Sequence, residues 1–450
     1  MHREDAVEQG YLSLCEYAVT QGEKMGADES EAMVVKKSST SVTAELEELT
    51  TVSSITWEGL RLRVIKDKAM ASVFTYKVDR RSIHEAVKRA VKAAQSSWKD
   101  AHWSSLPSPG RYPHIQVWDE SIAHITPQIL IEPVSEMLKN IPPHLTIHRI
   151  AHEASTRERV CVNSNGICHA DRGTHENFMI RALRKDHQDN VTPTFYLASY
   201  QRRYDPPYHL VQELEEKVSL FNTKQRAHSG KTTVILSPLT TLKLFHHSLL
   251  GALSGESVAR DRSFFVNKVG EHVASPQFSL HDNGLIEEGT ASQEMDDEGV
   301  PSQDTALIRE GVLTGFIWDD YWATRMQAQS TGNAFYNERT GRMGIRHTNL
   351  VIECGTHGWG ELLEGENGYF IYDVRGAHSS NPDTGAFTVA ASPAYRILDG
   401  CISGGVTGMM ISDSIFSLIK KIDAVGRDRE VRQDAIFPYI RCENVHVIAP

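Results

Sequence analysis

The sequence lacks the long apolar runs that membrane proteins carry. Its 450 residues are 40% hydrophobic, but no run approaches the roughly 18 consecutive apolar residues of a transmembrane helix. The first ten residues, MHREDAVEQG, are polar and acidic, so they do not predict a signal peptide. We therefore expect a protein with no membrane partner.

Cysteine is scarce, and its positions form no C-x-x-C pair. The six residues are Cys15, Cys161, Cys168, Cys354, Cys401 and Cys442. A chain of this length does not depend on disulfides for its stability. The pattern is typical of a reducing compartment, and we expect a cytoplasmic protein.

Positive charge is also in short supply. Lys and Arg total 47 against 58 Asp and Glu, which gives a formal net charge of −11 with histidine neutral. Because phosphate backbones repel an acidic protein, this balance argues against a nucleic-acid partner. Short basic clusters such as Arg80-Arg81 and Arg202-Arg203 are expected to be solvated surface.

Several common motifs are missing. No G-x-G-x-x-G follows a predicted strand and no G-x-x-x-x-G-K-[ST] occurs, so nucleotide binding has no motif support. The G-x-S-x-G sequence of a nucleophile elbow is absent as well.

The first part of the chain has clear periodic patterns. Residues 4–25 place apolar side chains on one helical face, and Gly26 stands where a C-cap is expected. The segment 59–64 alternates instead, with apolar even positions and with Arg61 and Arg63 at odd ones. Such a strand has one buried face. Together with strands at 31–35, 41–46 and 69–76 it predicts an antiparallel meander, with turns at 58–59 and 66–68.

Helices and further strands follow. Ser82 and Glu85 form a capping-box pattern ahead of a helix that stops before Trp98. A helix is also predicted from Thr126-Pro127 to about Asn140, with strands at 145–152 and 159–163 after it. The segment NSNG at 163–166 predicts a turn. An amphipathic helix is expected over 209–221.

Ser229-Gly230 marks a boundary, which predicts one domain over 1–228 and a second over 229–450. The second begins with a strand at 232–236 and a helix capped by Ser237, with Pro238 at its first position. Beyond residue 285 the pattern is mostly short strands and Gly-rich turns, with a helix near 414–422. We expect an α+β protein whose second domain is rich in strands.

The helix after Ser237 carries two adjacent histidines, His246 and His247. Neighbouring residues on a helix point about 100° apart, so this pair cannot easily share one metal ion. The helical wheel places His246 near the apolar stripe and His247 away from it. The simplest interpretation is one packed and one exposed histidine.

Other candidates fit known sites less well. His152-Glu153 begins like H-E-x-x-H, but position 156 is Thr156 and the segment reads as a strand. Three further candidates, Cys161, Cys168-His169 and His175, match no zinc spacing. The acidic run at 296–298 lacks the alternation of a calcium loop, so a turn at Gly299 and Pro301 with solvated carboxylates is expected.

The ordered set of motifs resembles the TldD/PmbA family, also called the modulator-of-gyrase or microcin-processing family. The motifs are GA at 26–27, GLRLRV at 59–64, NSNG at 163–166, LSGE at 253–256, RSF at 262–264, DDEGVP at 296–301, TALIREGVL at 305–313, STGN at 330–333, NLVI at 349–352, TGAFT at 384–388 and AVGRD at 424–428. The resemblance covers nearly the whole chain. It implies a mixed α/β N-terminal domain and a β-rich, partly barrel-like C-terminal domain.

The resemblance also implies a test for catalysis. Catalytic TldD-type members are metallopeptidases with H-E-x-x-x-H on a helix and a downstream Cys ligand, whereas PmbA/TldE-type members lack this motif and pair with TldD. Anchoring on LSGE places the first His at His246, the Glu at His247 and the second His at Gly251. The metal Cys would follow 426–428, after a helix that ends there, and no Cys occurs between Val425 and Phe437.

The leading hypothesis is a PmbA/TldE-type, metal-free subunit of a peptidase complex that acts on unfolded or extended peptides. It predicts no cofactor in this chain, with zinc in a TldD-like partner, and leaves open whether the partner is TldD-like or a second copy. The alternative is an autonomous hydrolase or metallopeptidase around His246 and His247, or the acidic run at 296–298. A nucleic-acid regulator, suggested by the family's older name, conflicts with the charge.

Overall fold

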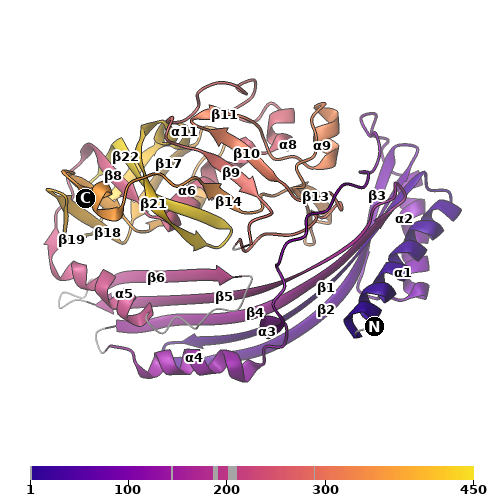
Figure 1. Ribbon diagram of the computed structural model, residues 1–450, viewed down its shortest axis with the longest axis horizontal. Helices are drawn as coiled ribbons and strands as arrows, with labels where there is room; N and C mark the ends of the chain where they lie inside the picture. The colour runs from indigo at the N-terminus through magenta and orange to yellow at the C-terminus, as the bar shows by residue number, and fades with distance from the viewer. Residues whose placement is uncertain (1–2, 143–144, 186–190, 201–209, 288) are drawn as a thin grey trace.

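The computed structural model describes residues 3–142, 145–185, 191–200, 210–287 and 289–450. A curved six-stranded sheet formed by the N-terminal half lies beneath a larger, strand-rich C-terminal half (Figure 1). This arrangement confirms the α+β class and the antiparallel N-terminal sheet. Among the described helices, none is long and apolar enough to cross a membrane. All six cysteines lie in the described ranges and are free thiols.

The N-terminal sheet is antiparallel throughout and has the strand order β3-β2-β1-β4-β5-β6. Its strands are β1 (Glu29–Glu45), β2 (Glu48–Lys66), β3 (Ala69–Thr75), β4 (Leu145–Asn163), β5 (Cys168–Lys185) and β6 (Val191–Tyr200). Helices cover its outer, convex face (Figure 1). In chain order the N-terminal helices are α1 (Arg3–Lys24), α2 (Arg80–Gln95), α3 (Glu120–Ala123), α4 (Pro127–Lys139), α5 (Leu210–Ser219) and the 3-10 turn η1 (Leu220–Asn222).

The strands are longer than the sequence pattern suggests. The predicted strands 31–35 and 41–46 form one strand, β1, and those at 145–152 and 159–163 form β4. The predicted turn at 58–59 is wrong, because Gly59 lies inside β2 and the chain reverses at Leu46-Glu47 instead. Gly59 is needed there for packing, since a Cβ atom would lie 2.3 Å from the Phe74 ring. The turns at 66–68 and 163–166 are confirmed.

Helix α2 shows the expected packing and a different cap. Its apolar stripe is buried as predicted: Ile83, Ala86, Val87, Ala90, Val91 and Ala94. The N-cap is Asp79, whose carboxylate accepts the Ser82 N–H, so the prediction that Ser82 caps the helix is wrong. Asp79, three residues before Ser82, is the N-cap because its carboxylate reaches the free N–H groups of the first turn.

The C-terminal half contains a 14-stranded sheet and a separate β12-β13 hairpin. Its strands are β7 (Lys224–Gln225), β8 (Gly230–Leu236), β9 (Leu280–Asn283), β10 (Asp304–Arg309), β11 (Val312–Leu313), β12 (Ala334–Asn337), β13 (Arg342–Ile345), β14 (Leu350–Ile352), β15 (Gly368–Ile371), β16 (Val374–Arg375), β17 (Ala386–Ala391), β18 (Ala394–Leu398), β19 (Cys401–Val406), β20 (Met410–Ser414), β21 (Ile422–Arg432) and β22 (Ala435–Ile448). Because β7 pairs with β19, the chain enters this sheet before residue 229. The boundary at 228/229 stays a prediction.

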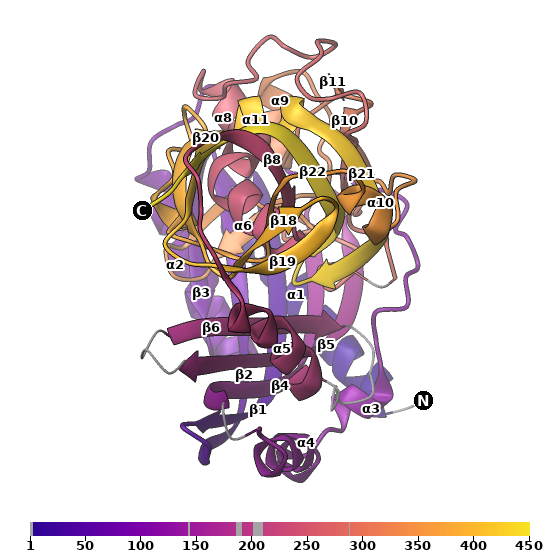
Figure 2. The same cartoon turned by 90° about the vertical axis from the view of Figure 1, so that its left-hand side faces the viewer.

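The C-terminal sheet curves around helix α6 (Figure 2). The helices of this half are α6 (Pro238–Ser248), α7 (Leu250–Leu253), α8 (Gly255–Ala259), α9 (Asp320–Arg325), α10 (Trp359–Leu363), α11 (Ile415–Leu418) and the 3-10 turns η2 (Ala377–Ser379) and η3 (Ile419–Lys421). The predicted cap of α6 is confirmed, with the Ser237 hydroxyl accepting the Thr240 N–H at 3.1 Å. The predicted helix ending at 424–428 is wrong, because this segment belongs to β21.

A buried ion network joins the two halves, and it corrects two predictions. Arg61 and Arg63 of β2 do not face solvent, because both bind Glu31 and Arg63 also binds Glu298 at 2.6 Å. Arg159 of β4 binds Asp297 at 2.8 Å. The acidic run at 296–298 is therefore not solvated: it forms the C-terminal side of the joint. The turn at Gly299 is confirmed.

Candidate functional site

The last turn of α6 presents the two candidate histidines. Most of the helix is buried, but His246 is exposed and His247 is half-buried. This reverses the prediction that His246 packs and His247 is exposed. Partial desolvation lowers the pKa of both histidines, and the charge of the neighbouring His347 adds to the effect at His246.

A second histidine pair lies next to His246. The ring centroids of His246 and His347 are 6.2 Å apart, with planes inclined at 76°. His347 Nε2 is 3.0 Å from Asp434 Oδ2. Burial alone would raise the pKa of Asp434, but this hydrogen bond and the His347 charge hold it below its usual value. The sequence pattern did not single out His347 or Asp434.

The residues at the metal positions do not fit zinc. Zinc sites use at least three His, Cys or carboxylate ligands, and position 251 is a glycine with no donor atom. The space beside Gly251 is bounded by Pro382, 3.8 Å from where a Cβ would lie. Among the described residues, no group of three or more His, Cys, Asp or Glu side chains is placed to hold a metal ion.

The segment where the metal Cys would lie also differs from the predicted loop. Residues 426–428 lie in β21, where the pairing with β22 is irregular between Val425 and Arg429. Cys442 is buried in β22, and burial raises the pKa of its thiol. A buried, protonated thiol on the neighbouring strand does not replace the missing ligand.

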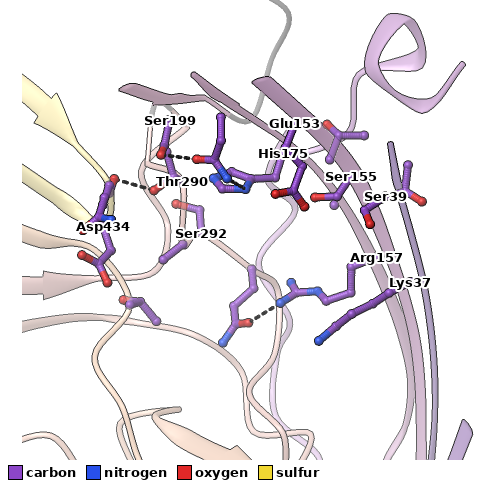
Figure 3. A pocket seen from close by; sticks show the side chains of 18 of the residues that line it. Lys37, Ser39, Glu153, Ser155, Arg157, His175, Ser199, Thr290, Ser292 and Asp434 are labelled. Carbon is purple, nitrogen blue, oxygen red and sulfur yellow. Dashed lines mark hydrogen bonds between the residues drawn. The ribbon is translucent and has the colours of Figure 1, made fainter. Parts of the chain in front are cut away.

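Between the two halves lies a cleft of about 730 Å³, here called the central cleft. One wall is the concave face of the N-terminal sheet, and the other consists of loops of the C-terminal half (Figure 3). The sheet wall includes Lys37, Ser39, Trp57, Glu153, Ser155, Arg157 and His175. The opposite wall includes Thr290, Ser292, Gln293, Phe335, Arg346, His347 and Asp434. His347 and Asp434 line the cleft, and His246 lies next to His347.

The central cleft is polar, and its ionisable groups are perturbed. Burial, with help from Arg157, lowers the pKa of His175 to about 4, so this histidine is neutral at physiological pH. Burial raises the pKa of Glu153 on the same wall. The remaining lining is rich in hydroxyls, including Ser39, Ser155 and Ser292, which can donate or accept hydrogen bonds. Such a surface suits a ligand with many polar backbone groups.

The other sequence candidates are separated by the fold. His152 is buried on the outer face of β4, where it is bonded to Glu176 at 2.8 Å, whereas Glu153 faces the cleft. His169 stacks on Tyr112 and contacts Glu294 at 2.9 Å. His175 faces the cleft, as described above. Cys161 is buried against Met33, Ile167 and Met295, and Cys168 is exposed. These residues do not form a shared site.

The sequence analysis missed the two cleft arginines, Arg157 and Arg346. One signal was present: β4 carries Arg157 and Arg159 at alternate positions, as β2 carries Arg61 and Arg63. Alternating charges on two strands of one sheet indicate that the sheet has a polar face. Arg346 follows β13 and has no such signal.

The comparisons with known proteins agree with this geometry. The model for the PmbA/TldA metallopeptidase C-terminal domain matches residues 229–449, and the model for PmbA/TldA metallopeptidase domain 1 matches residues 30–94. The chain belongs to the PmbA/TldD family. The resemblance seen in the sequence is thereby confirmed.

Two relatives are similar to the chain over nearly its full length. The crystal structure of TldE from Thermococcus kodakarensis superposes with a TM-score of 0.91 at 28% identity, over 96% of this chain and 99% of that one. An uncharacterised protein of Methanocaldococcus jannaschii is 27% identical over 426 residues, 93% of this chain and 96% of that protein.

The match to a named metalloprotease is partial. A metalloprotease TldD homologue of Haemophilus influenzae is 30% identical over 205 residues, which is 46% of this chain and 42% of that protein. A putative modulator of DNA gyrase from Thermotoga maritima has a TM-score of 0.88 over 97% of this chain and 99% of that one, but at 20% identity this shows the fold alone.

Proposed function

We propose that this PmbA/TldD-family chain is a TldE-like subunit that holds no metal of its own and works in a TldD/TldE-type metallopeptidase complex. The observation that carries the proposal is α6: the positions of the expected H-E-x-x-x-H motif hold His246, His247 and Gly251 on an otherwise intact helix. These positions offer neither a second metal ligand in place of Gly251 nor a carboxylate to act as general base, and metal-assisted hydrolysis at the end of α6 requires both. The full-length similarity to TldE supports the same assignment.

In this proposal the chain contributes substrate binding and the partner contributes metal and chemistry. The polar, hydroxyl-lined central cleft suits an unfolded or extended peptide, whose backbone offers donors and acceptors at every residue. The partner is a TldD-like metallopeptidase subunit; a second copy of this chain is the competing possibility. We propose a cytoplasmic complex without nucleic-acid or membrane partners.

The experiment is co-expression with the TldD-like protein from the same organism. We expect a stable complex by size-exclusion chromatography, with zinc bound in proportion to the TldD-like subunit alone, and peptide hydrolysis by the complex but not by this chain. Substituting the partner's H-E-x-x-x-H glutamate should abolish hydrolysis. Tightly bound metal in this chain alone, or a failure to associate, would contradict the proposal.

The alternative is an autonomous hydrolase, and one observation favours it. His246 lies beside the hydrogen-bonded His347–Asp434 pair at the wall of the cleft. The test is peptide cleavage by the purified chain alone. If His246→Ala removes this activity and the matched His247→Ala does not, the autonomous-hydrolase hypothesis replaces the subunit hypothesis.

A further inference from the structure

Two arginines in the central cleft, the half-buried Arg157 and the exposed Arg346, lack the carboxylate partner that the buried arginines around the joint possess. Arg61, Arg63 and Arg159 each bind a carboxylate. Among the described residues, neither Arg157 nor Arg346 does. The Nη1 of Arg157 donates to the neutral Gln293 Oε1 at 3.3 Å, and its buried Nε has no hydrogen-bond partner, as is also true of the Nε atoms of Arg61 and Arg63. What sets Arg157 apart is the missing carboxylate, because a desolvated guanidinium without a counter-charge is costly unless a ligand supplies one.

The strand pairing of the N-terminal sheet adds to the cost of the Arg157 charge. Arg157 is directly opposite Lys37 in the β1–β4 register, on the same cleft-facing side. Like charges placed directly opposite on neighbouring strands repel each other. Burial, together with the nearby Arg159 charge, lowers the pKa of Arg157 to about 10. An anion between these cations would remove the repulsion.

A glycine on the neighbouring strand β5 lies beside the Arg157 guanidinium. On its other side Arg157 is paired with Gly173 of β5. A Cβ at position 173 would lie 3.9 Å from Arg157 Nη2, so the guanidinium lies against the strand at this glycine. Across the cleft, Arg346 stacks on Phe335 with its Cζ 3.9 Å from the ring centroid. Stacking fixes the plane of a guanidinium and leaves its edge free for a ligand.

The carboxylates that line the cleft do not act as counter-ions to Arg157 and Arg346. Asp297 is bound by Arg159 and by the Tyr336 N–H. Asp434 is bound by His347. Glu153 has its pKa raised by burial, which favours its neutral form. The cleft therefore has cationic donors in excess of the anions available to them.

We propose that Arg157 and Arg346 bind a carboxylate group of a peptide held in the central cleft. Planar guanidinium forks match a carboxylate in bidentate geometry, whereas the nearby Lys37 already pairs with Glu338 at 3.4 Å. The cleft volume of about 730 Å³ is far larger than a lone anion and lies in the usual range for organic ligands. Trp57 and Phe335 offer apolar surface to the rest of the ligand. That the ligand is a peptide rests on the proposed function; the carboxylate site itself does not.

The test is calorimetric titration of the purified chain with three N-acetylated octapeptides of Ala, Ser and Gly. The first has a free C-terminal carboxylate, the second a C-terminal amide, and the third an amide with one internal Glu. We expect the acid to bind at least about tenfold more tightly than the plain amide, since a charged hydrogen-bond partner is lost. The third peptide distinguishes the sources: binding like the acid would show that a side-chain carboxylate is accepted as well, and binding like the amide would restrict the site to a C-terminal carboxylate.

The variants decide whether the arginines are responsible. Arg157→Gln and Arg346→Gln should each weaken the acid by about tenfold and leave the amide unchanged, while the exposed Arg342→Gln should have no effect. Arg157→Lys keeps the charge and should recover part of the affinity. Unchanged thermal unfolding midpoints would show that the variants are folded.

The outcomes separate this inference from the proposed function. Equal affinity for acid and amide, no binding at all, or affinity independent of both arginines would overturn the inference, even if the chain forms an active complex with a TldD-like subunit. Arginine-dependent binding of a peptide carboxylate by a chain that forms no such complex would support the inference and refute the proposed function.

Discussion

At the scale of single residues, the joint depends on charges that water cannot reach. Arg63 is almost fully buried and binds Glu31 and Glu298 at 2.6 Å each. Such ion pairs gain little net stability over apolar residues, because desolvation offsets their attraction. Removing one member is different, since it leaves the other charges buried and uncompensated.

Arg63→Met should therefore destabilise the chain by about 3–5 kcal/mol. The matched control is Arg149→Met on the same sheet, whose pair with Glu45 is exposed at 3.4 Å, and it should cost less than about 1 kcal/mol. Urea unfolding followed by tryptophan fluorescence measures both. Equal effects of the two variants would show that the buried network contributes nothing special.

The same arginines show what sequence reasoning cannot see at this scale. The alternation in β2 correctly identifies two faces, with Leu60 and Leu62 packed against the helices. It wrongly assigns Arg61 and Arg63 to solvent, because nothing local reveals that an acidic turn more than 200 residues later covers that face. A charge on a strand looks the same whether water or a carboxylate solvates it.

At the scale of elements, α6 and α4 allow a comparison of helix starts. Both begin with a hydroxyl residue followed by proline, Ser237-Pro238 and Thr126-Pro127. The Ser237 hydroxyl accepts the Thr240 N–H and donates to the Tyr372 carbonyl at 2.6 Å. The Thr126 side chain makes no capping hydrogen bond.

Ser237→Ala should cost about 1–2 kcal/mol, because it leaves a buried N–H and a buried carbonyl without partners. Thr126→Ala should cost less than about 0.5 kcal/mol, since it removes no capping bond. Thermal and urea unfolding of the two variants under the same conditions provide the measurement. A larger loss for Thr126→Ala would contradict this account.

Element prediction succeeded where local periodicity decides and failed where packing decides. The stripe of α2 and the start of α6 follow from local rules. Strands β1 and β4 were divided because hydroxyl and charged residues in their middle, such as Ser39 and Glu158, interrupt the alternation. Ser39 lines the central cleft, and Glu158, on the other face, pairs with Lys36 at 2.9 Å. The site follows the same pattern: α6 was located from its motif, whereas the cleft required the fold.

At the scale of the whole molecule, the joint between the halves carries carboxylates close to one another. Asp319 caps α9 by accepting the Trp322 N–H, and the next residue donates its N–H to Glu298. Burial and the Glu298 charge raise the pKa of Asp319 to about 8, against the opposing effect of Arg63. The pKa of Asp320 is likewise raised to about 6.

The raised pKa values give the joint a pH dependence of definite sign. The folded chain holds protons on Asp319 that the unfolded chain releases near pH 4, so this residue favours folding most at low pH. Its contribution declines as the pH rises from about 4 to the folded pKa of about 8 and is lost above it. Carboxylates with lowered pKa values, such as Asp171 and Asp297, act oppositely, and their contribution disappears only in acid.

Asp319→Asn should separate these effects, because asparagine keeps the cap but carries no charge. Between pH 6 and 9 the free energy of unfolding of the wild type should fall more steeply than that of Asp319→Asn, so the variant gains relative stability as the pH rises. The exposed Asp383→Asn is the control and should follow the wild type throughout. Urea unfolding at four pH values is the measurement. Parallel curves for wild type and Asp319→Asn would mean that Asp319 is already ionised in the folded chain.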